Sequence, residues 1–148
     1  MATAPERPGR GFADRVPDRA YRPSANEEYM SAAQLAYFRA KLVTWRDEVL
    51  RESQETIAQL KSGPLQASDQ NDRATSESDW GIELRTRDRQ RKLIAKIDAA
   101  LRRIDAGDFG FCEVTGEPIS LARLEARPIA TMTIEAQERH ERQERISI

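Results

Sequence analysis

Apolar residues between Ser31 and Leu60 recur at alternating steps of three and four, the spacing of one face of an α-helix. The regular part of this stripe consists of Leu35, Phe38, Leu42, Trp45 and Val49. A strict heptad pattern of this kind is typical of a coiled-coil seam. Ser31 is a good N-cap, and the Gly-Pro pair at 63–64 cannot easily continue a helix, so we expect one helix between these points.

A second apolar stripe follows a polar gap. Its members form two pairs with a spacing of seven, Ile94 with Leu101 and Ile97 with Ile104. Ala106-Gly107 then supplies a helix stop. Two helices of similar length, each with one apolar seam and joined by a short loop, predict an antiparallel hairpin. We therefore expect a mainly α fold: a long antiparallel coiled-coil hairpin, a small globular domain and a C-terminal helix from about Ile134.

The composition supports long solvated helices better than one compact core. Of the 148 residues, 33% are charged and only 6% are aromatic. The net charge of −1 supplies no basic field for nonspecific nucleic-acid binding, so no direct sequence-specific DNA binding is expected. Cys112 is the single cysteine, which excludes an intrachain disulfide and favours a reducing cytoplasm. No apolar run approaches the roughly 18 to 20 residues of a membrane span.

Three regions are expected along the chain. Residues 1–30 form an N-terminal tail, rich in Pro, Gly, Arg and Asp, that docks in part on the globular domain. Phe12, Val16 and Tyr21 are the residues that would pin it there. Residues 31–107 form the coiled-coil hairpin, with an acidic tip near 67–79. Residues 108–148 form the small globular domain and the C-terminal helix.

Residues 108–136 have the outline of a small zinc-binding module. A zinc ribbon places a C-x-x-C pair at each end, and the four corresponding positions here are Cys112, Thr115, Thr133 and Ala136. A structural zinc site needs about four thiolate or imidazole donors. Only Cys112 and the distant His140 qualify, so we expect a zinc-finger-like domain without zinc. We interpret Cys112 as a small buried residue; the alternative, a redox-sensing thiol, requires a depressed pKa and exposure.

Charge is segregated along the second predicted helix. The segment 67–80 carries four acids against Arg73, and the segment 85–96 behind it carries six cations against Asp88. One interpretation is a solvated helix whose first-turn acids suit the helix dipole. The other is a helix that carries carboxylates into a partner's site containing metal or phosphate, while its basic segment binds an acidic or phosphate-bearing surface of that partner. No nucleophile elbow, phosphate loop or catalytic pairing is present, so no enzyme is expected.

Five motifs lie between about residues 27 and 136: "EEYMSAAQLAYFR" at the start of the first predicted helix, "DQNDRA" near the tip, "LRTRDRQRKLIAKI" in the second helix, and "DFGFCE" and "RLEARP" in the zinc-finger-like segment. Together they resemble the DksA/TraR family of bacterial RNA polymerase-binding transcription factors. The first motif is similar to the family's entry into the first coiled-coil helix, and "DQNDRA" matches its tip pattern. "LRTRDRQRKLIAKI" is similar to the second helix. "DFGFCE" and "RLEARP" follow the zinc-finger signature, whose ligand positions stay in register although three of the four ligands are replaced. The resemblance thus implies a zinc-free member.

The resemblance implies that the chain binds RNA polymerase through the secondary channel. The expected effect is to destabilise open complexes at ribosomal RNA-type promoters and to activate others, together with the effector guanosine tetraphosphate (ppGpp). The tip function falls on Asp69, Asp72, Arg73 and Ala74. A polymerase contact falls on Arg89, and the ppGpp site on Lys96 and Arg127. The third basic position of that site is Gln137, a departure that would weaken it. A cytoplasmic monomer is expected.

Two other functions stay open at this point. A Gre-like transcript-cleavage factor also places an acidic coiled-coil tip in the same channel, although such proteins carry a different and larger globular domain after the coiled coil. A plain coiled-coil adaptor without a polymerase partner is the second alternative.

Overall fold

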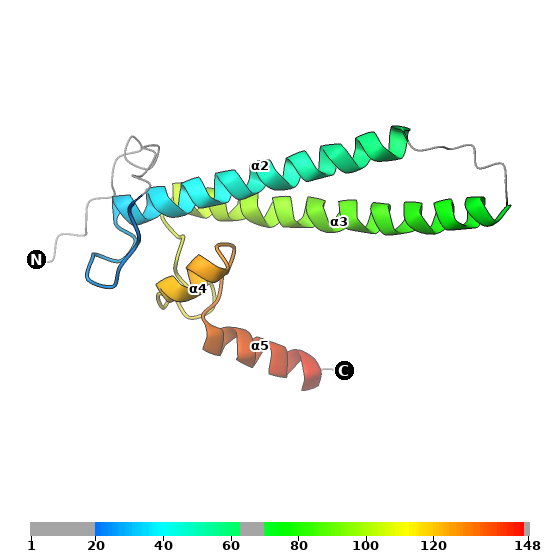
Figure 1. The fold of residues 1–148 in the computed structure, drawn as a ribbon. Helices are drawn as coiled ribbons and strands as arrows, with labels where there is room; N and C mark the ends of the chain where they lie inside the picture. The colour runs from blue at the N-terminus through cyan, green and yellow to red at the C-terminus, as the bar shows by residue number, and fades with distance from the viewer. Residues whose placement is uncertain (1–19, 63–69, 147–148) are drawn as a thin grey trace, which may run out of the picture. The chain divides into compact units, whose positions relative to one another are not determined.

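The computed structural model describes residues 20–62 and 70–146 (Figure 1). Within these ranges the chain forms four α-helices and one isolated bridge between Phe111 and Pro118. The helices are α2 (Ala32–Ser62), α3 (Gln70–Ala106), α4 (Leu121–Ala126) and α5 (Ile134–Ile146). The expected mainly α fold with a coiled-coil hairpin is confirmed. No described helix is both long enough and apolar enough to cross a membrane.

The two long helices begin and end at the residues that the sequence indicates. At the start of α2, the Ser31 hydroxyl accepts a hydrogen bond from the backbone N–H of Gln34, at 3.3 Å. At the end of α3, Gly107 has a φ of +82°. The N–H of Gly107 donates to the carbonyl of Ile104, and that of Asp108 to the carbonyl of Arg103, at 3.2 and 2.9 Å. These two bonds form a Schellman motif, which needs a residue that tolerates positive φ.

The chain divides into two compact units. The first, here called the module, combines the chain up to Leu42 with Ala99–Ile148, and the second, here called the shaft, is Val43–Asp98. Both units contain a segment of α2 beside a segment of α3. Arg39 pairs with Asp105 at 2.8 Å in the module, and Arg46 pairs with Asp98 at 2.6 Å in the shaft. Moving forward along α2 from Arg39 to Arg46 means moving backward along α3 from Asp105 to Asp98, so the two helices are antiparallel.

The module contains most of the buried side chains of the described residues. Phe38 is fully buried, and its ring lies 5.6 Å from that of Phe109 between centroids. Ile119 and Leu124 are also fully buried. The module core consists mainly of Phe38, Leu42, Ile104, Phe109, Ile119 and Leu124. The first part of the heptad stripe, up to Leu42, and the apolar residues of the zinc-finger-like segment therefore share one core.

The segment before α2 is joined to the module by hydrogen bonds. Tyr21 donates to the Glu27 carboxylate at 2.7 Å, and that carboxylate also accepts from the side chain of Gln34 at 3.2 Å. Gln34 is fully buried, so its polar atoms need such partners. The tail residues Phe12 and Val16 lie outside the described residues. The domain boundaries expected from the sequence stay predictions.

Tyr29 fixes the zinc-finger-like segment at two points. Its hydroxyl lies 2.6 Å from the carbonyl oxygen of Gly110 and 2.5 Å from that of Ile119. These carbonyls belong to opposite arms of the turn that contains Cys112. The ring of Tyr29 also packs edge-on against Phe111, with centroids 5.5 Å apart. Burial raises the pKa of Tyr29 to about 12, so the hydroxyl keeps its proton and can donate at neutral pH.

The shaft has a thin apolar seam. Val49 and Ile97 are its buried apolar residues within the described part of the chain, whereas Ile82 and Leu84 are about half exposed. Next along the seam of α3, the side-chain oxygen of Gln90 is buried without a hydrogen-bond partner. A buried unpaired acceptor costs about 1–3 kcal/mol. The seam is therefore apolar near Val49 and Ile97 and polar further along α3 toward the loop.

We expect Tyr29→Phe to lower the free energy of unfolding by about 1–3 kcal/mol, because the partly buried carbonyl of Ile119 loses the donor that Tyr29 supplies, whereas the Gly110 carbonyl keeps its bond from the N–H of Ile119. Thermal or urea unfolding followed by circular dichroism measures this loss. Tyr21→Phe is the matched control and should cost less, because the Glu27 carboxylate keeps its bonds from Ser24 and Gln34. Equal costs for the two variants would contradict the assigned role of Tyr29.

Candidate functional site

The four positions of the zinc-ligand frame lie on two turns of the module. Cys112 begins the first turn, where its N–H donates to the carbonyl of Glu117 and its carbonyl accepts from the N–H of Gly116, at 2.8 and 2.9 Å. Gly116 has a φ of +74°, which a residue with a side chain rarely adopts. Cys112 is 3% exposed, whereas Thr115 in the same turn is exposed. The backbone of this turn is therefore tight, and Gly116 suits its positive φ.

The second turn has acquired another role, because it now starts helix α5. The Thr133 hydroxyl accepts from the N–H of Ala136 at 3.2 Å, and the Thr133 carbonyl accepts from the N–H of Gln137 at 2.9 Å. Thr133 is therefore the N-cap of α5. Ala136 is buried in the first turn of that helix and offers no donor atom. Both positions now stabilise a helix end, a role that the ligand frame alone does not predict.

Cys112 sits among hydrogen-bond donors. Burial acts to raise the pKa of its thiol. Hydrogen bonds from the Thr115 hydroxyl and from backbone N–H groups of Thr115, Thr133 and Val114 outweigh burial and lower the pKa to about 7. Groups of both turns therefore contribute to the lowered pKa of Cys112.

These residues do not fit a tetrahedral zinc site. Cys112 supplies the one thiolate, the Thr133 oxygens are engaged at the helix start, and Ala136 has no ligand atom. Across residues 20–62 and 70–146, no cluster of three or more His, Cys, Asp or Glu side chains could hold a metal ion. Other bonds join the two turns instead, including one of 2.8 Å from the N–H of Glu113 to the carbonyl of Thr131.

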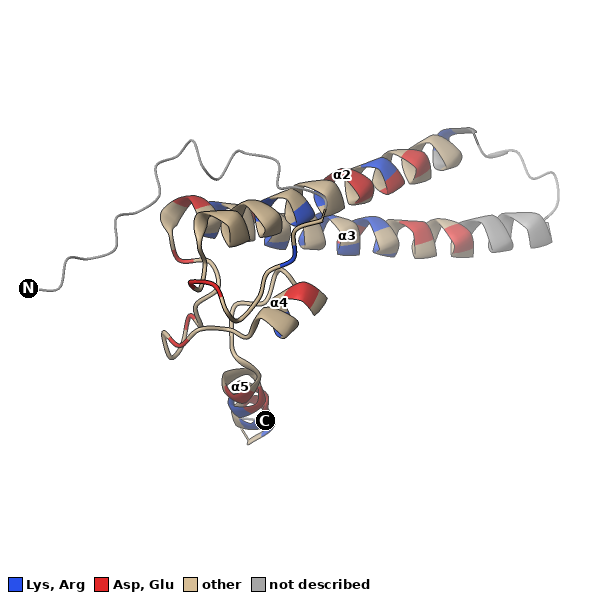
Figure 2. Ribbon diagram, turned by 60° about the vertical axis from the view of Figure 1, so that its left-hand side comes forward, with Lys and Arg blue, Asp and Glu red and all other residues tan. Residues whose placement is uncertain are grey.

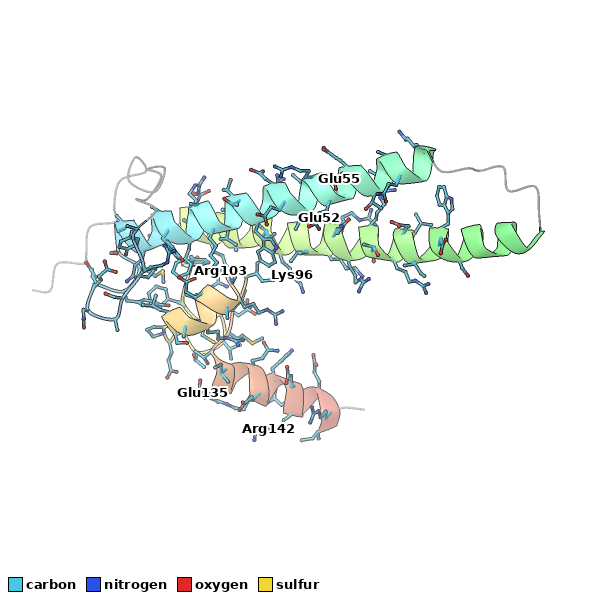
Figure 3. All side chains as sticks on the ribbon, viewed as in Figure 1. Glu52, Glu55, Lys96, Arg103, Glu135 and Arg142 are labelled. Carbon is cyan, nitrogen blue, oxygen red and sulfur yellow. The ribbon has the colours of Figure 1, made fainter. Side chains whose placement is uncertain are left out.

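Arg103 adds a link from α3 to the same turn. Its guanidinium donates to the carbonyls of Phe111 and Asp108, at 2.6 and 3.1 Å, and lies 3.8 Å from the Glu113 carboxylate. Figure 3 labels Arg103 on α3. The sequence indicated this residue only as part of a charged helix. Its contact with the residue before Cys112 could not be read from spacing alone.

A stripe of cations follows one face of α3 in the shaft. Its members, at steps of four, three and four, are Arg85, Arg89, Lys92 and Lys96. All four are exposed, and Lys92 is the member that pairs with an acid, Asp88, at 3.0 Å. Hydrogen bonds from Lys92 and Arg91 hold the pKa of the Asp88 carboxyl below its usual range. Within the shaft, Figure 2 shows acidic positions on α3 nearer the loop and basic positions further along.

Three tip residues, Asp72, Arg73 and Ala74, fall within the backbone of α3, and their side chains lie outside the description. Asp69 lies outside the described residues altogether. The proposed tip chemistry therefore rests on the sequence motif. The adjacent part of α3 carries a large apolar side chain, Trp80, that is 38% exposed.

The residues expected to bind ppGpp occupy different units. Lys96 is exposed on α3 in the shaft (Figure 3), and Arg127 is exposed in the module, immediately after α4. Gln137 lies in the first turn of α5, and its side-chain amide donates to Glu141 at 3.1 Å. Helix α4 itself was not expected from the sequence. Ser120 as a cap and Pro128 as a stop are the signals that could have predicted it.

Comparison with known proteins reveals clear relatives. Residues 34–104 match the family described as DnaK suppressor protein DksA, N-terminal domain, and residues 107–142 match the prokaryotic dksA/traR C4-type zinc finger. A protein of Caulobacter vibrioides named RNA polymerase-binding transcription factor DksA is 61% identical over 126 residues, which cover 85% of this chain and 89% of that protein. The Escherichia coli protein of the same name is 43% identical over 115 residues, 78% of this chain and 76% of that protein.

A solved structure is also similar. Transcription factor DksA2 from Pseudomonas aeruginosa aligns with a TM-score of 0.75 and 41% sequence identity, covering 82% of this chain and 95% of that one. The similarity therefore extends over both the coiled coil and the zinc-finger-like segment.

We expect Thr115→Val to raise the pKa of Cys112 from about 7 toward its ordinary value of about 8.5, because the variant removes a donor to the thiolate. A thiol whose pKa is depressed by folding contributes stability above its unfolded pKa and loses it as the pH falls through the folded pKa. The destabilisation caused by Thr115→Val should therefore be larger at roughly pH 9 than at roughly pH 6. Ultraviolet titration of the thiolate and urea unfolding at both pH values measure these effects. A pH-independent cost would contradict the hydrogen bond.

Proposed function

Because the chain belongs to the DksA family, we propose that it binds bacterial RNA polymerase directly and regulates the initiation of transcription. The observation that carries this proposal is the 61% identity over 126 residues with a relative named for polymerase binding. The matched residues cover 85% of this chain, so they include parts of both the coiled coil and the module. Helices of the lengths observed for α2 and α3 suit a partner with a deep channel, and we propose the secondary channel of the polymerase.

The basic stripe on α3 supports a binding role for the shaft. Exposed cations at helical spacing, with Arg89 at their centre, offer a continuous positive face to an acidic protein wall. Electrostatic contacts of this type guide association and fix register more than they add affinity. We propose Arg89 as a polymerase contact on this stripe.

We propose that the tip produces the regulatory effect on the polymerase and contributes little to the binding affinity. Asp69 and Asp72 would bring carboxylates near the catalytic magnesium, where the bound ion dominates the local charge. Arg73 and Ala74 complete the tip motif. In this proposal the tip destabilises open complexes at ribosomal RNA-type promoters and favours initiation at others.

We propose that ppGpp is the effector and that it binds at the boundary with the polymerase, through Lys96 and Arg127. Both side chains are exposed cations, as a phosphate ligand requires. Gln137 replaces the third cation of the family's site, and this loss weakens the response to ppGpp. The regulator is further proposed to be a cytoplasmic monomer without enzymatic activity, because its partner is the cytoplasmic polymerase and the chain carries no catalytic motif.

In vitro transcription tests the function directly. The purified chain, added to polymerase on a ribosomal RNA promoter, should lower transcription and shorten the lifetime of the open complex, more so when ppGpp is present. If the chain instead stimulated cleavage of transcripts in stalled elongation complexes, it would act as a Gre-like factor. Failure to capture polymerase subunits in a pull-down would favour an adaptor without this partner.

We propose that the module is a zinc-free variant of the family's finger. The donor set Cys112, Thr115, Thr133 and Ala136 supports this, since Thr133 and Ala136 are committed to the start of α5. Purified protein should contain far less than one equivalent of zinc by elemental analysis, and a chelator should leave its melting temperature unchanged. One equivalent of tightly held zinc would overturn this part of the proposal.

Replacing both Asp69 and Asp72 with Asn should separate binding from effect. Asn keeps the size and the capping ability of Asp, so the hairpin should remain folded. We expect the double variant to bind polymerase within a few-fold of the wild type and yet to leave the open-complex lifetime unchanged. Fluorescence binding and open-complex decay assays measure the two properties.

Arg89→Ala is the matched contrast for the tip variant. It should weaken polymerase affinity by about two- to fivefold, as expected for one exposed ionic contact. At high protein concentration the variant should still shorten the open-complex lifetime as the wild type does. If the Asn double variant inhibited a ribosomal RNA promoter as well as the wild type, the tip acids would serve only as helix caps.

A further inference from the structure

Helix α4 is too short to be stable without support. It has six residues, Leu121–Ala126, whereas isolated helices need about 12–15 residues even for marginal stability. Its first turn is capped by Ser120, whose hydroxyl accepts from the N–H of Arg123 at 3.2 Å. Its last turn has carbonyls that no residue of the helix itself can satisfy. The position of this last turn therefore depends on other elements.

Lys41 of α2 supplies the missing donor at the end of α4. Its ammonium donates to the backbone carbonyl of Glu125 at 2.9 Å and to the carboxylate of the same residue at 2.5 Å. Tyr37, one turn earlier on α2, donates its hydroxyl to the other carboxylate oxygen, at 2.5 Å. Glu125 thus receives three hydrogen bonds from one face of α2. We call Tyr37, Lys41 and Glu125 the α4 clamp.

The clamp combines charge with partial burial. The side chains of Lys41 and Glu125 are 35% and 34% exposed, so water screens the pair only in part. Burial acts to raise the pKa of Glu125, but the bonds from Lys41 and Tyr37 and the charges of Lys41 and Arg22 outweigh it, and its pKa lies below the usual range. Lys41 and Arg22 also lie about the Tyr37 ring, 5.9 and 6.0 Å from its centroid. The carboxylate therefore stays charged and held at neutral pH.

Arg127 follows the clamped turn directly. It is the C-cap of α4, and its backbone N–H donates to the carbonyl of Arg123 at 2.7 Å. Its side chain is exposed. Only Ala126 separates it from Glu125, so its backbone directly continues the turn that Lys41 holds. Binding of a phosphate ligand by a guanidinium depends on such orientation.

We propose that Lys41 and Tyr37 are positioning residues for the effector: through Glu125 they fix the last turn of α4 and thereby orient Arg127 toward the phosphates of ppGpp. This inference rests on the proposed function, because it takes Arg127 as an effector contact. A purely structural role is the competing explanation. The two differ in what they predict when Arg127 is already absent.

The experiment uses Lys41→Met, which keeps the length of the side chain and removes its donors. For each variant, ppGpp is titrated into the complex of the full chain with RNA polymerase, and inhibition of a ribosomal RNA promoter is measured. We expect Lys41→Met to raise the half-maximal ppGpp concentration about five- to tenfold, with polymerase affinity in the absence of ppGpp changed less than about twofold. Tyr37→Phe should shift it less in the same direction, and Lys41→Arg should restore most of the response.

A double-variant cycle distinguishes positioning from stability. Lys41→Met combined with Arg127→Ala should respond to ppGpp no worse than Arg127→Ala alone, because the lysine acts through the arginine. Arg39→Met is the matched control, since it breaks another α2 ion pair, to Asp105 of α3. It should leave the ppGpp titration unchanged. Melting temperatures identify any variant that fails to fold, in which case Tyr37→Phe and Lys41→Arg carry the test.

The outcomes that overturn the inference are separate from those that overturn the function. A wild type that responds to ppGpp while Lys41→Met responds equally well would overturn the inference alone. The inference would also be overturned if the rise in half-maximal ppGpp concentration in the double variant equalled the product of the rises in the two single variants. A wild type that binds polymerase but ignores ppGpp would overturn both the effector role and this inference. A wild type that does not bind polymerase would overturn the proposed function itself.

Discussion

The contact between the rings of Phe38 and Phe109 joins the coiled coil to the zinc-finger-like segment in one core. Phe38 belongs to the heptad stripe of α2, and Phe109 opens the turn that leads to Cys112. A segment of about 40 residues cannot usually bury a sufficient core by itself. Here it does not need to, because Phe38, Leu42 and Ile104 supply apolar surface from the long helices. This shared core also contains Leu124 of α4, the helix that Arg127 follows.

Three positions of the zinc-ligand frame have structural tasks of their own. Cys112 is buried in the first turn, Thr133 caps α5, and Ala136 packs inside that helix. A zinc ion in a C4-type finger joins its two turns through one central ion. In this chain Tyr29, Arg103 and the bond between Glu113 and Thr131 contact the same region from several directions. Each of these bonds is weak compared with metal coordination.

The sequence predicted the features that depend on local periodicity and local backbone chemistry. Phe38, Leu42 and Val49 are buried as the heptad stripe requires, and Gly107 ends α3 with positive φ. It did not predict α4, because six residues are too few to establish a period. It could not predict the bond between Lys41 and Glu125, which are 84 positions apart. The assigned roles of Asp69, Asp72, Arg89, Lys96 and Arg127 came from motif resemblance and remain predictions.

The unpaired oxygen of Gln90 has a consequence for how the protein unfolds. Buried apolar side chains are concentrated in the module, while the described shaft beyond Val49 and Ile97 has a polar seam. Little free energy then opposes local separation of the two helices in that part of the shaft, and such openings leave the module core intact. A melting curve of this protein therefore reports mainly on the module. The two-state approximation, which assigns one stability to a whole chain, holds for the module better than for the shaft.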